Sequence, residues 1–406
     1  MIDSIRSLTR IRPRASLAER LVTLRLERLG DGVLEIEHQG RSATFGHPAA
    51  DGLRAKVTVL DGSLFRRALL GGTLGAGEAY LDGAWTTDDL TQLIQVFARN
   101  SELLERFELG TSRLGSWLAG LGPATRRNTP SGSRRNIADH YDLGNDFFAL
   151  MLDPTLTYSA AIFERPTSTL EEASVHKLDL LCRKLELSPA DHLLEIGTGW
   201  GSLAIHAAAK YGCRVTTTTL SREQRELAQA RIRERRLDGR ITVLDRDYRE
   251  LEGRFDKIVS CEMIEAVGRE YYADFFGRCG SLLAPGGLLA LQAITVRDRR
   301  FESASHQVDF IKRYIFPGSC MPSVTALLVA ATRSSDLGLR SLEDFTPHYA
   351  RTMAEWRRNL EPHQREVVER FGERFWRMWI YYLAYCEAGF AERHIHSVQL
   401  VFERSR

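Results

Sequence analysis

The sequence lacks several features that would place a chain in a class at once. No stretch of its 406 residues approaches the roughly 20 consecutive apolar residues that a membrane-spanning helix needs. The N-terminal segment is charged and has no apolar core, so it does not resemble a secretory signal. If the substrate of this protein is membranous, we expect the protein to reach it from outside the bilayer.

Cysteine pairs at metal-ligand spacing and an excess of one charge are also missing. The six cysteines contain no CxxC pattern, which predicts reduced thiols in a cytoplasmic protein and no metal site. Lys and Arg number 55 against 53 acids, so no nucleic-acid partner is expected. Local basic clusters such as Arg297–Arg300 are either a solvated face or a contact with anionic lipid headgroups, at about 1 kcal/mol per basic residue.

The length predicts more than one domain, and the composition is globular, with 43% apolar and 27% charged residues. Residues 1–120 mix β-like stretches with amphipathic helices, which predicts a small α+β domain. Residues 121–135 are rich in Pro, Gly, Ser, Thr and Arg and read as a linker. Residues 136–406 then form the main domain.

From about residue 185 the chain alternates short apolar strands with helices. This rhythm predicts an α/β fold with a parallel sheet covered by helices on both faces. Residues 297–370 interrupt it with aromatic, Pro and Arg residues. We expect this segment to form a cap over the carboxyl edge of the sheet, where open α/β folds bind ligands.

A glycine motif follows the first of these strands. Gly197, Thr198, Gly199 and Gly201 can turn the backbone tightly and admit a ligand close to it. The spacing is GxGxG, and Glu195 stands just before it. Together with the Leu-Ala-Pro-Gly-Gly turn that starts at Leu283, this favours S-adenosylmethionine (SAM) over a nicotinamide cofactor and predicts a class I SAM-methyltransferase sheet of the Rossmann-like type.

Two later segments are candidates for holding the rest of SAM. The second strand ends in Thr219 and Leu220, with Gln224 one helical turn on, where such folds usually carry an acid for the ribose. Hydroxyl and amide groups could take over that hydrogen bonding, or Ser221 could be a helix cap beside a solvated Gln224. Asp247 and Tyr248 offer an acceptor and a flat ring for adenine; alternatively they are a turn acid and a packed tyrosine.

Several motifs occur together across residues 136–406. They include Asn136 to Phe148, Thr157-Tyr158-Ser159, Glu265-Ala266-Val267-Gly268, Tyr314-Ile315-Phe316-Pro317 and His348 to Thr352. In this combination the chain resembles the cyclopropane-fatty-acid synthase family, which includes the mycolic acid methyltransferases. The resemblance implies a SAM-dependent enzyme that acts on unsaturated acyl chains of membrane phospholipids. It also favours a homodimer and a peripheral position on the inner face of the membrane, with the N-terminal domain serving docking or dimerisation.

The resemblance further implies a bicarbonate ion beside the reacting carbons, held by a Glu, a Tyr, a His and two backbone N–H groups. The Glu is Glu265 and the Tyr is Tyr349. Two positions depart from the family pattern, because its Cys is Ala160 and its His is Gln292. Gln292 can donate a hydrogen bond but cannot become cationic near neutral pH, so weaker anion binding or a reshaped site is expected. The predicted catalytic positions are Ala160, Glu265, Gln292, Ile294 and Tyr349, and the resemblance adds Tyr158 and Ser159 to the SAM site.

The chemistry of an alkene acceptor defines what the site must do. An alkene attacks the sulfonium methyl directly and leaves a carbocation, so the enzyme must align, exclude water and place one base. Glu265 could fix a bicarbonate base or act as the base itself, or it could be only a carboxylate at the start of a helix. Glu262 is the competing, lower-ranked acid. Tyr314, Phe316 and Tyr349 could stabilise the cation, although the first two could equally be core residues.

The fate of the cation decides the product. Proton loss from the new methyl group closes a cyclopropane ring, whereas a hydride shift and then loss from the same carbon leaves a methylene branch, which a partner reductase could convert to a methyl branch. Two other functions remain open: methylation of a small apolar metabolite, and a lipid- or SAM-binding homologue without catalysis.

Overall fold

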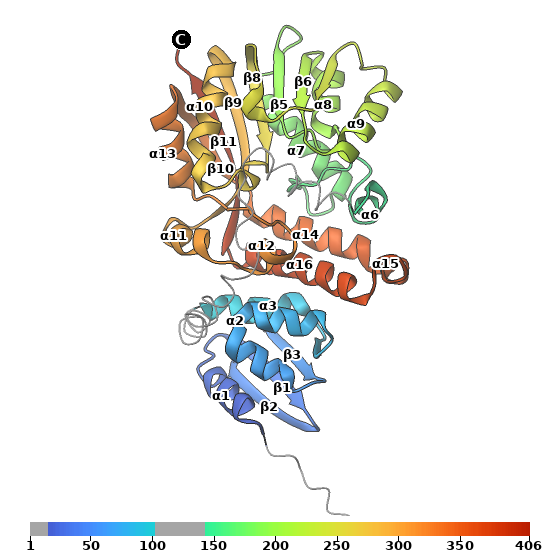
Figure 1. The fold of residues 1–406 in the computed structure, drawn as a ribbon, viewed down its shortest axis with the longest axis vertical. Coiled ribbons are helices and arrows are strands. Elements are labelled where there is room, and N and C mark those ends of the chain that lie inside the picture. The colour runs from blue at the N-terminus through green and yellow to red at the C-terminus, as the bar shows by residue number, and fades with distance from the viewer. Residues whose placement is uncertain (1–14, 102–142) are drawn as a thin grey trace, which may run out of the picture.

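The computed structural model describes residues 15–101 and 143–406, which form two bodies stacked along the long axis of the molecule (Figure 1). The predicted linker at 121–135 and the start of the family-like motif at 136–142 lie outside the described residues.

The N-terminal body is a four-stranded sheet covered by helices. Its strand order is β2-β1-β3-β4, in which β1 and β3 run parallel and the outer pairs are antiparallel. Along β1 every second side chain is buried, so one face of this sheet packs against the helices. The elements are α1 (Leu17–Leu26), β1 (Gly32–His38), β2 (Arg41–His47), β3 (Arg54–Val59), α2 (Ser63–Leu81), β4 (Trp85–Thr87) and α3 (Leu90–Arg99).

The C-terminal body is built on a seven-stranded sheet in the order β10-β11-β9-β8-β5-β6-β7. The five strands from β9 to β7 are parallel, and β11 runs antiparallel between β9 and β10. The strands are β5 (His192–Ile196), β6 (Arg214–Thr218), β7 (Ile241–Leu244), β8 (Phe255–Cys261), β9 (Leu283–Val296), β10 (Leu337–Asp344) and β11 (Ile395–Arg404).

Helices cover both faces of this sheet, which confirms the predicted α/β architecture. One apolar cluster joins the sheet to α7, α8 and α9, and a second joins the opposite face to α10 and α13. The covering elements are α7 (Leu170–Lys184), α8 (Ser202–His206) with the continuing turn η1 (Ala207–Tyr211), α9 (Arg222–Glu234), α10 (Tyr272–Leu282) and α13 (Val324–Ser334).

A third group of helices lies between the sheet and the N-terminal body (Figure 1). The predicted cap at 297–370 is wrong in its middle, because α13 and β10 belong to the sheet layer; Leu327 and Ala331 of α13 are core residues against α10. The cap also continues beyond 370 into α16. Its members are α6 (Asn145–Met151), α11 (Asp298–His306), α12 (Phe310–Tyr314), α14 (Thr346–Leu360), α15 (Gln364–Phe371) and α16 (Glu373–Ala391), and short turns η2 (Tyr248–Glu250), η3 (Ile264–Ala266), η4 (Arg269–Tyr271) and η5 (Glu361–His363) complete the fold.

No helix of the described residues is both long and apolar enough to cross a bilayer.

The two bodies share an apolar contact between α2 and α16. The ring of Tyr381 lies 5.6 Å from that of Tyr80 and 4.5 Å from that of Phe310. A Cβ on Gly77 would stand 3.3 Å from the Tyr381 ring, so a glycine lets the two helices approach. A single cluster of buried side chains therefore runs from one body into the other.

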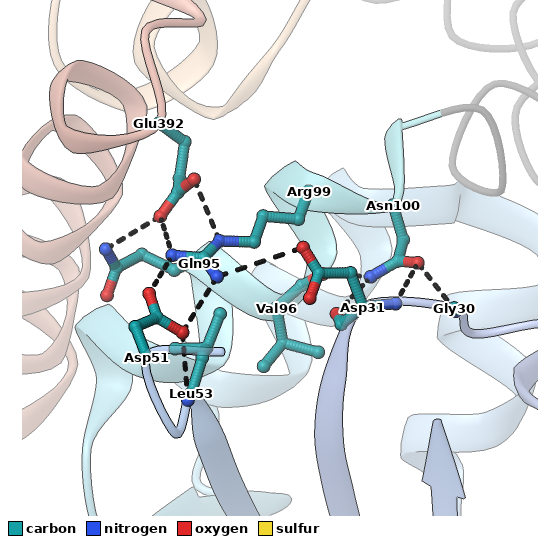
Figure 2. A network of polar contacts seen from close by, with 9 residues as sticks. All are labelled: Gly30, Asp31, Asp51, Leu53, Gln95, Val96, Arg99, Asn100 and Glu392. Carbon is teal, nitrogen blue, oxygen red and sulfur yellow. Dashed lines mark hydrogen bonds and ion pairs between the residues drawn. The ribbon is translucent and has the colours of Figure 1, made fainter. Parts of the chain in front are cut away.

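A polar network fixes the edge of this contact (Figure 2). Arg99, in the last turn of α3, donates from Nε to Oε2 of Glu392 over 3.0 Å and from Nη1 to Oδ1 of Asp51 over 3.0 Å. Gln95 adds a 3.0 Å hydrogen bond to Oε1 of Glu392. The Asn100 side chain accepts from the Gly30 N–H at 2.8 Å and donates to the Asp31 carbonyl at 2.7 Å. Arg99 thus joins two loops of the N-terminal body to the end of α16.

We expect Arg99→Ala to lower the free energy of unfolding by about 2 kcal/mol, because it leaves the largely buried Glu392 carboxylate without its cation. Urea unfolding measures the change. Arg365→Ala is the matched control, since its ion pair with Glu369 lies exposed on α15 and should matter by no more than about 0.5 kcal/mol. Equal losses in the two variants would show that the network does not hold the bodies together.

Candidate functional site

A cavity of about 1820 Å³ begins at the carboxyl ends of the parallel strands and extends into the N-terminal body. The glycine motif, the loop after β6, the segment after β8 and α16 all contribute to its wall. This is the edge of the sheet at which open α/β folds bind ligands.

The glycine motif forms a backbone cradle at one end of this cavity. Gly197, Gly199 and Gly201 have φ values of 105°, 50° and 85°, the left-handed region that glycine adopts without strain. A Cβ on Gly199 would meet no described atom within 4 Å, so a ligand has open access to that backbone. Gly201 serves packing instead, because its Cβ would lie 3.2 Å from that of Ala228 on α9. The cradle therefore fits SAM.

The loop after β6 offers amide donors. Thr219 Oγ1 donates to Oε1 of Gln224 over 3.0 Å, which leaves the Nε2 hydrogens of that buried side chain for a ligand. Ser221 Oγ caps α9 by accepting from the Gln224 N–H at 3.2 Å. Ser221 is therefore a helix cap, as one reading of the sequence had it, but Gln224 is buried rather than solvated. Leu220 lines the cavity beside them.

Asp247 and Tyr248 also line the cavity, with firm protein contacts of their own. The Asp247 carboxylate accepts from Nε and Nη2 of Arg249 at 2.8 and 2.7 Å. The Tyr248 ring packs edge-on against Phe275 at 5.5 Å, and its buried hydroxyl has no hydrogen-bond partner among the described residues. A turn acid beside a packed tyrosine describes these contacts, and both side chains still reach the cavity wall.

A buried lysine also lines this cavity, and its role could not be recognised from the sequence. Lys177 of α7 is 1% exposed, and its Nζ donates to Ser159 Oγ over 2.7 Å. Its positive charge opposes the rise in pKa that burial imposes on Glu195 and Glu262. In the sequence Lys177 looks like any polar position on an amphipathic helix.

Glu262, the first residue after β8, stands at the centre of the polar contacts. Its backbone φ is 51°, a left-handed conformation that costs a residue with a side chain about 1–2 kcal/mol. Its N–H is held by the Gln292 carbonyl at 2.8 Å. Its carboxylate accepts from the Ala160 N–H at 2.9 Å, from Gln292 Nε2 at 2.8 Å and from the Tyr349 hydroxyl at 2.6 Å. Strain of this kind persists where surrounding contacts fix it, often at functional sites.

The donors to Glu262 are themselves held in place. Gln292 Oε1 accepts from Gln399 Nε2 at 2.8 Å, so its amide can present only its nitrogen to Glu262. The Tyr349 ring stacks on Phe390 with centroids 4.2 Å apart. The Gln292 amide thus accepts a hydrogen bond from Gln399 and donates one to Glu262.

Glu265 faces the same cavity with fewer partners. Its Oε1 accepts from the Ile294 N–H, and its buried Oε2 has no partner among the described residues. Burial and, after it, the negative charge of Glu262 raise the pKa of Glu265 to about 8. Burial also raises the pKa of Glu262, but its three donors oppose that rise. Near neutral pH we therefore assign the negative charge to Glu262 and a proton to Glu265.

The structure brings the five predicted catalytic positions around these two carboxylates. Glu262, ranked below Glu265 on sequence grounds, receives most of the hydrogen bonds. Phe316 and Tyr158 line the cavity, but Tyr314 does not, because it ends α12 facing the N-terminal body and its hydroxyl donates to Glu78 over 2.8 Å.

This site has counterparts among known proteins. The family model described as mycolic acid cyclopropane synthetase matches residues 128–400. A tuberculostearic acid methyltransferase of Mycobacterium tuberculosis is 38% identical over 83% of this chain and 80% of its own length. A cyclopropane-fatty-acyl-phospholipid synthase of Escherichia coli is 35% identical over 86% of this chain and 88% of its own.

Solved structures agree. The cyclopropane synthase MmaA2 of Mycobacterium tuberculosis superposes with a TM-score of 0.63 at 34% identity, over 67% of this chain and 98% of that one. A mycolic acid cyclopropane synthase complexed with SAH and CTAB gives a TM-score of 0.63 at 31% identity, with the same coverage of both chains.

The fold and the glycine cradle define the class: this is a SAM-dependent methyltransferase with a class I sheet, and SAM is its methyl donor. Within that class the chain belongs to the mycolic acid cyclopropane synthetase family.

We expect Glu265→Gln to make stability less dependent on pH. The folded protein keeps the Glu265 proton up to about pH 8, whereas the unfolded chain releases it near 4.5. Between these values the folded state binds more protons, so stability falls as pH rises, by up to about 1.4 kcal/mol per pH unit. The gain of Glu265→Gln over the wild type should grow across this window in urea unfolding, and the exposed Glu252→Gln should follow the wild type. Parallel curves for Glu265→Gln and the wild type would contradict the assigned proton.

Proposed function

We propose that this enzyme transfers the methyl group of SAM to a carbon–carbon double bond in an unsaturated acyl chain of a phospholipid. The observation that carries the proposal is a pair of carboxylates, the half-buried Glu262 and the buried Glu265, in a cavity that runs from the SAM cradle along apolar and aromatic side chains. The names of the similar proteins, a fatty-acyl-phospholipid synthase and a tuberculostearic acid methyltransferase, support the same substrate class. The described residues contain no group of His, Cys, Asp and Glu that could hold a metal ion.

SAM supplies an electrophilic methyl group. The π electrons of the alkene form the new carbon–carbon bond as the sulfur–carbon bond breaks, which leaves a cation on the neighbouring carbon. The largely apolar wall disfavours water that would trap this cation, and the rings of Tyr349 and Phe390 in that wall supply electron density without a covalent bond. The remaining step is the loss of one proton to a base.

We assign that base to Glu262. The resemblance led us to expect a bicarbonate held by the donors at Ala160, Gln292, Ile294 and Tyr349 together with Glu265. In the structure three of these donors contact the Glu262 carboxylate instead, which presents the same planar pair of oxygens. The Glu262 side chain would therefore take the place of an exchangeable bicarbonate ion. Gln292 suits such a base, because a cationic histidine at this position would lower the basicity of the carboxylate that it contacts.

The proposed product is an acyl chain with one added carbon. It is a cyclopropane if the proton leaves the new methyl group directly, and a methylene branch if a hydride shift comes first. The branched product would require a partner reductase to become a methyl branch. In either case the substrate lies in a membrane that the enzyme reaches from its surface.

Turnover with labelled SAM and vesicles of a dioleoyl phospholipid tests the function. We expect one acyl chain to gain the mass of one CH₂ group, and NMR of the product then separates a ring from a methylene branch. Transfer of the methyl group to a small apolar metabolite in the absence of lipid would instead support a small-molecule methyltransferase. No transfer to any lipid would defeat the proposal.

We expect wild-type turnover to be the same in carbon-dioxide-free buffer and in bicarbonate. Glu262→Gly should lose at least about 100-fold in rate, because it removes the base, while calorimetry shows unchanged SAM affinity. The vacated donors should then bind added bicarbonate and restore part of the rate. Glu252→Gly, on an exposed loop, is the control and should keep full activity. Stimulation of the wild type by bicarbonate would contradict the role of Glu262.

A further inference from the structure

The cavity has a second arm that the methyl transfer does not use. It passes into the N-terminal body, where it is lined by buried apolar side chains. They are Leu26, Leu34, Ile36, Val57, Phe65 and Leu93, contributed by α1, β1, β3, α2 and α3.

The two arms belong to one continuous cavity. Its wall includes Glu262 and Gly199 at the SAM end, Tyr381 and Tyr385 of α16 between the bodies, and Ala68 of α2 in the N-terminal arm. The helix α2 is interrupted beside the cavity at Gly72, whose φ of 58° and ψ of −140° are not helical. The Arg99 network joins α3 and the loop at Asp51 to Glu392 at the end of α16 (Figure 2).

The cavity, at about 1820 Å³, is larger than the roughly 300–1,000 Å³ of a site for one ligand, so it has room for more than one ligand group. The buried apolar lining of the N-terminal arm favours an apolar occupant over water.

We propose that the N-terminal arm holds the second acyl chain of the same phospholipid whose unsaturated chain lies at Glu262. This inference rests on the proposed function and names the form of the substrate: an intact two-chain lipid bound by both bodies. A phospholipid has two apolar chains that diverge from one charged headgroup. Two arginines of the cavity wall, Arg300 of α11 and Arg313 of α12, lie on the helices between the sheet and the N-terminal body (Figure 1), where an anionic headgroup would stand. Lys312 also lines the wall, but its ammonium donates to three backbone carbonyls between residues 304 and 307.

Photo-cross-linking of the full chain tests the location directly. The probe is a phosphatidylglycerol with one oleoyl chain and one saturated chain that carries a diazirine at mid-length, presented in vesicles. We expect mass spectrometry to find the label on β1, α2 and α3, near Leu34, Phe65 and Leu93. Label confined to the C-terminal body, or to the exposed leucines of α1 such as Leu17 and Leu24, would overturn the proposal. The label does not depend on methyl transfer, so its outcome is distinct from a failure of the proposed function.

A cavity-filling variant tests the consequence for substrate choice. Ala68→Trp places a large ring in the N-terminal arm, whereas Ala43→Trp adds the same ring on the exposed strand β2. Because each excluded CH₂ is worth about 0.8 kcal/mol, we expect Ala68→Trp to raise KM for a dioleoyl phospholipid by about tenfold or more. KM for an oleoyl lysophospholipid, which has one chain, should change by less than about twofold, and Ala43→Trp should alter neither. An equal rise of KM for both lipids, or no rise, would contradict a second-chain site.

Discussion

The arrangement of this enzyme depends on one half-buried carboxylate in a strained backbone. Glu262 occupies a left-handed conformation directly after β8 and receives hydrogen bonds from three other segments of the chain. A buried carboxylate that lacked such donors would take up a proton, because burial alone disfavours the charged form. The donors keep Glu262 available as a base, while its neighbour Glu265, with one backbone donor, holds the proton. Two acids within one turn of backbone thus acquire different charges from their surroundings.

The parallel sheet explains why these groups meet at all. β5 and β6 lead into the SAM cradle, Glu262 directly follows β8, and β9 carries Gln292 and Ile294 beside it. Neighbouring parallel strands deliver their carboxyl ends to a single edge, so the donor and the base lie at one opening. The helices α14 and α16 close that opening with Tyr349 and Phe390, and the N-terminal body covers the far side. The fold therefore brings the SAM cradle and the two carboxylates to one cavity whose lining is mostly apolar.

Much of this could be predicted from the sequence, because the signals are local. The glycine motif and the alternation of strands and helices gave the sheet and the cofactor, and the resemblance brought Ala160, Glu265, Gln292, Ile294 and Tyr349 to one place. Which of Glu262 and Glu265 receives the donors depends on the backbone of the turn after β8. The residue types in that turn do not indicate that Glu262 adopts a left-handed conformation. Lys177 was missed because its burial arises from packing between α7 and the segment at Ser159. The predicted extent of the cap was wrong because α13 belongs to the sheet layer. In the sequence its apolar pattern lies within a segment rich in polar and aromatic residues, so it was not distinguished from the cap.

A crystal structure of the enzyme with S-adenosylhomocysteine, grown in saturating bicarbonate, tests the central claim most directly. We expect the Glu262 carboxylate to keep its hydrogen bonds from the Ala160 N–H, the Gln292 amide and the Tyr349 hydroxyl, with no ion bound to these donors. Density for a bicarbonate on those donors, with the Glu262 side chain turned away, would contradict it.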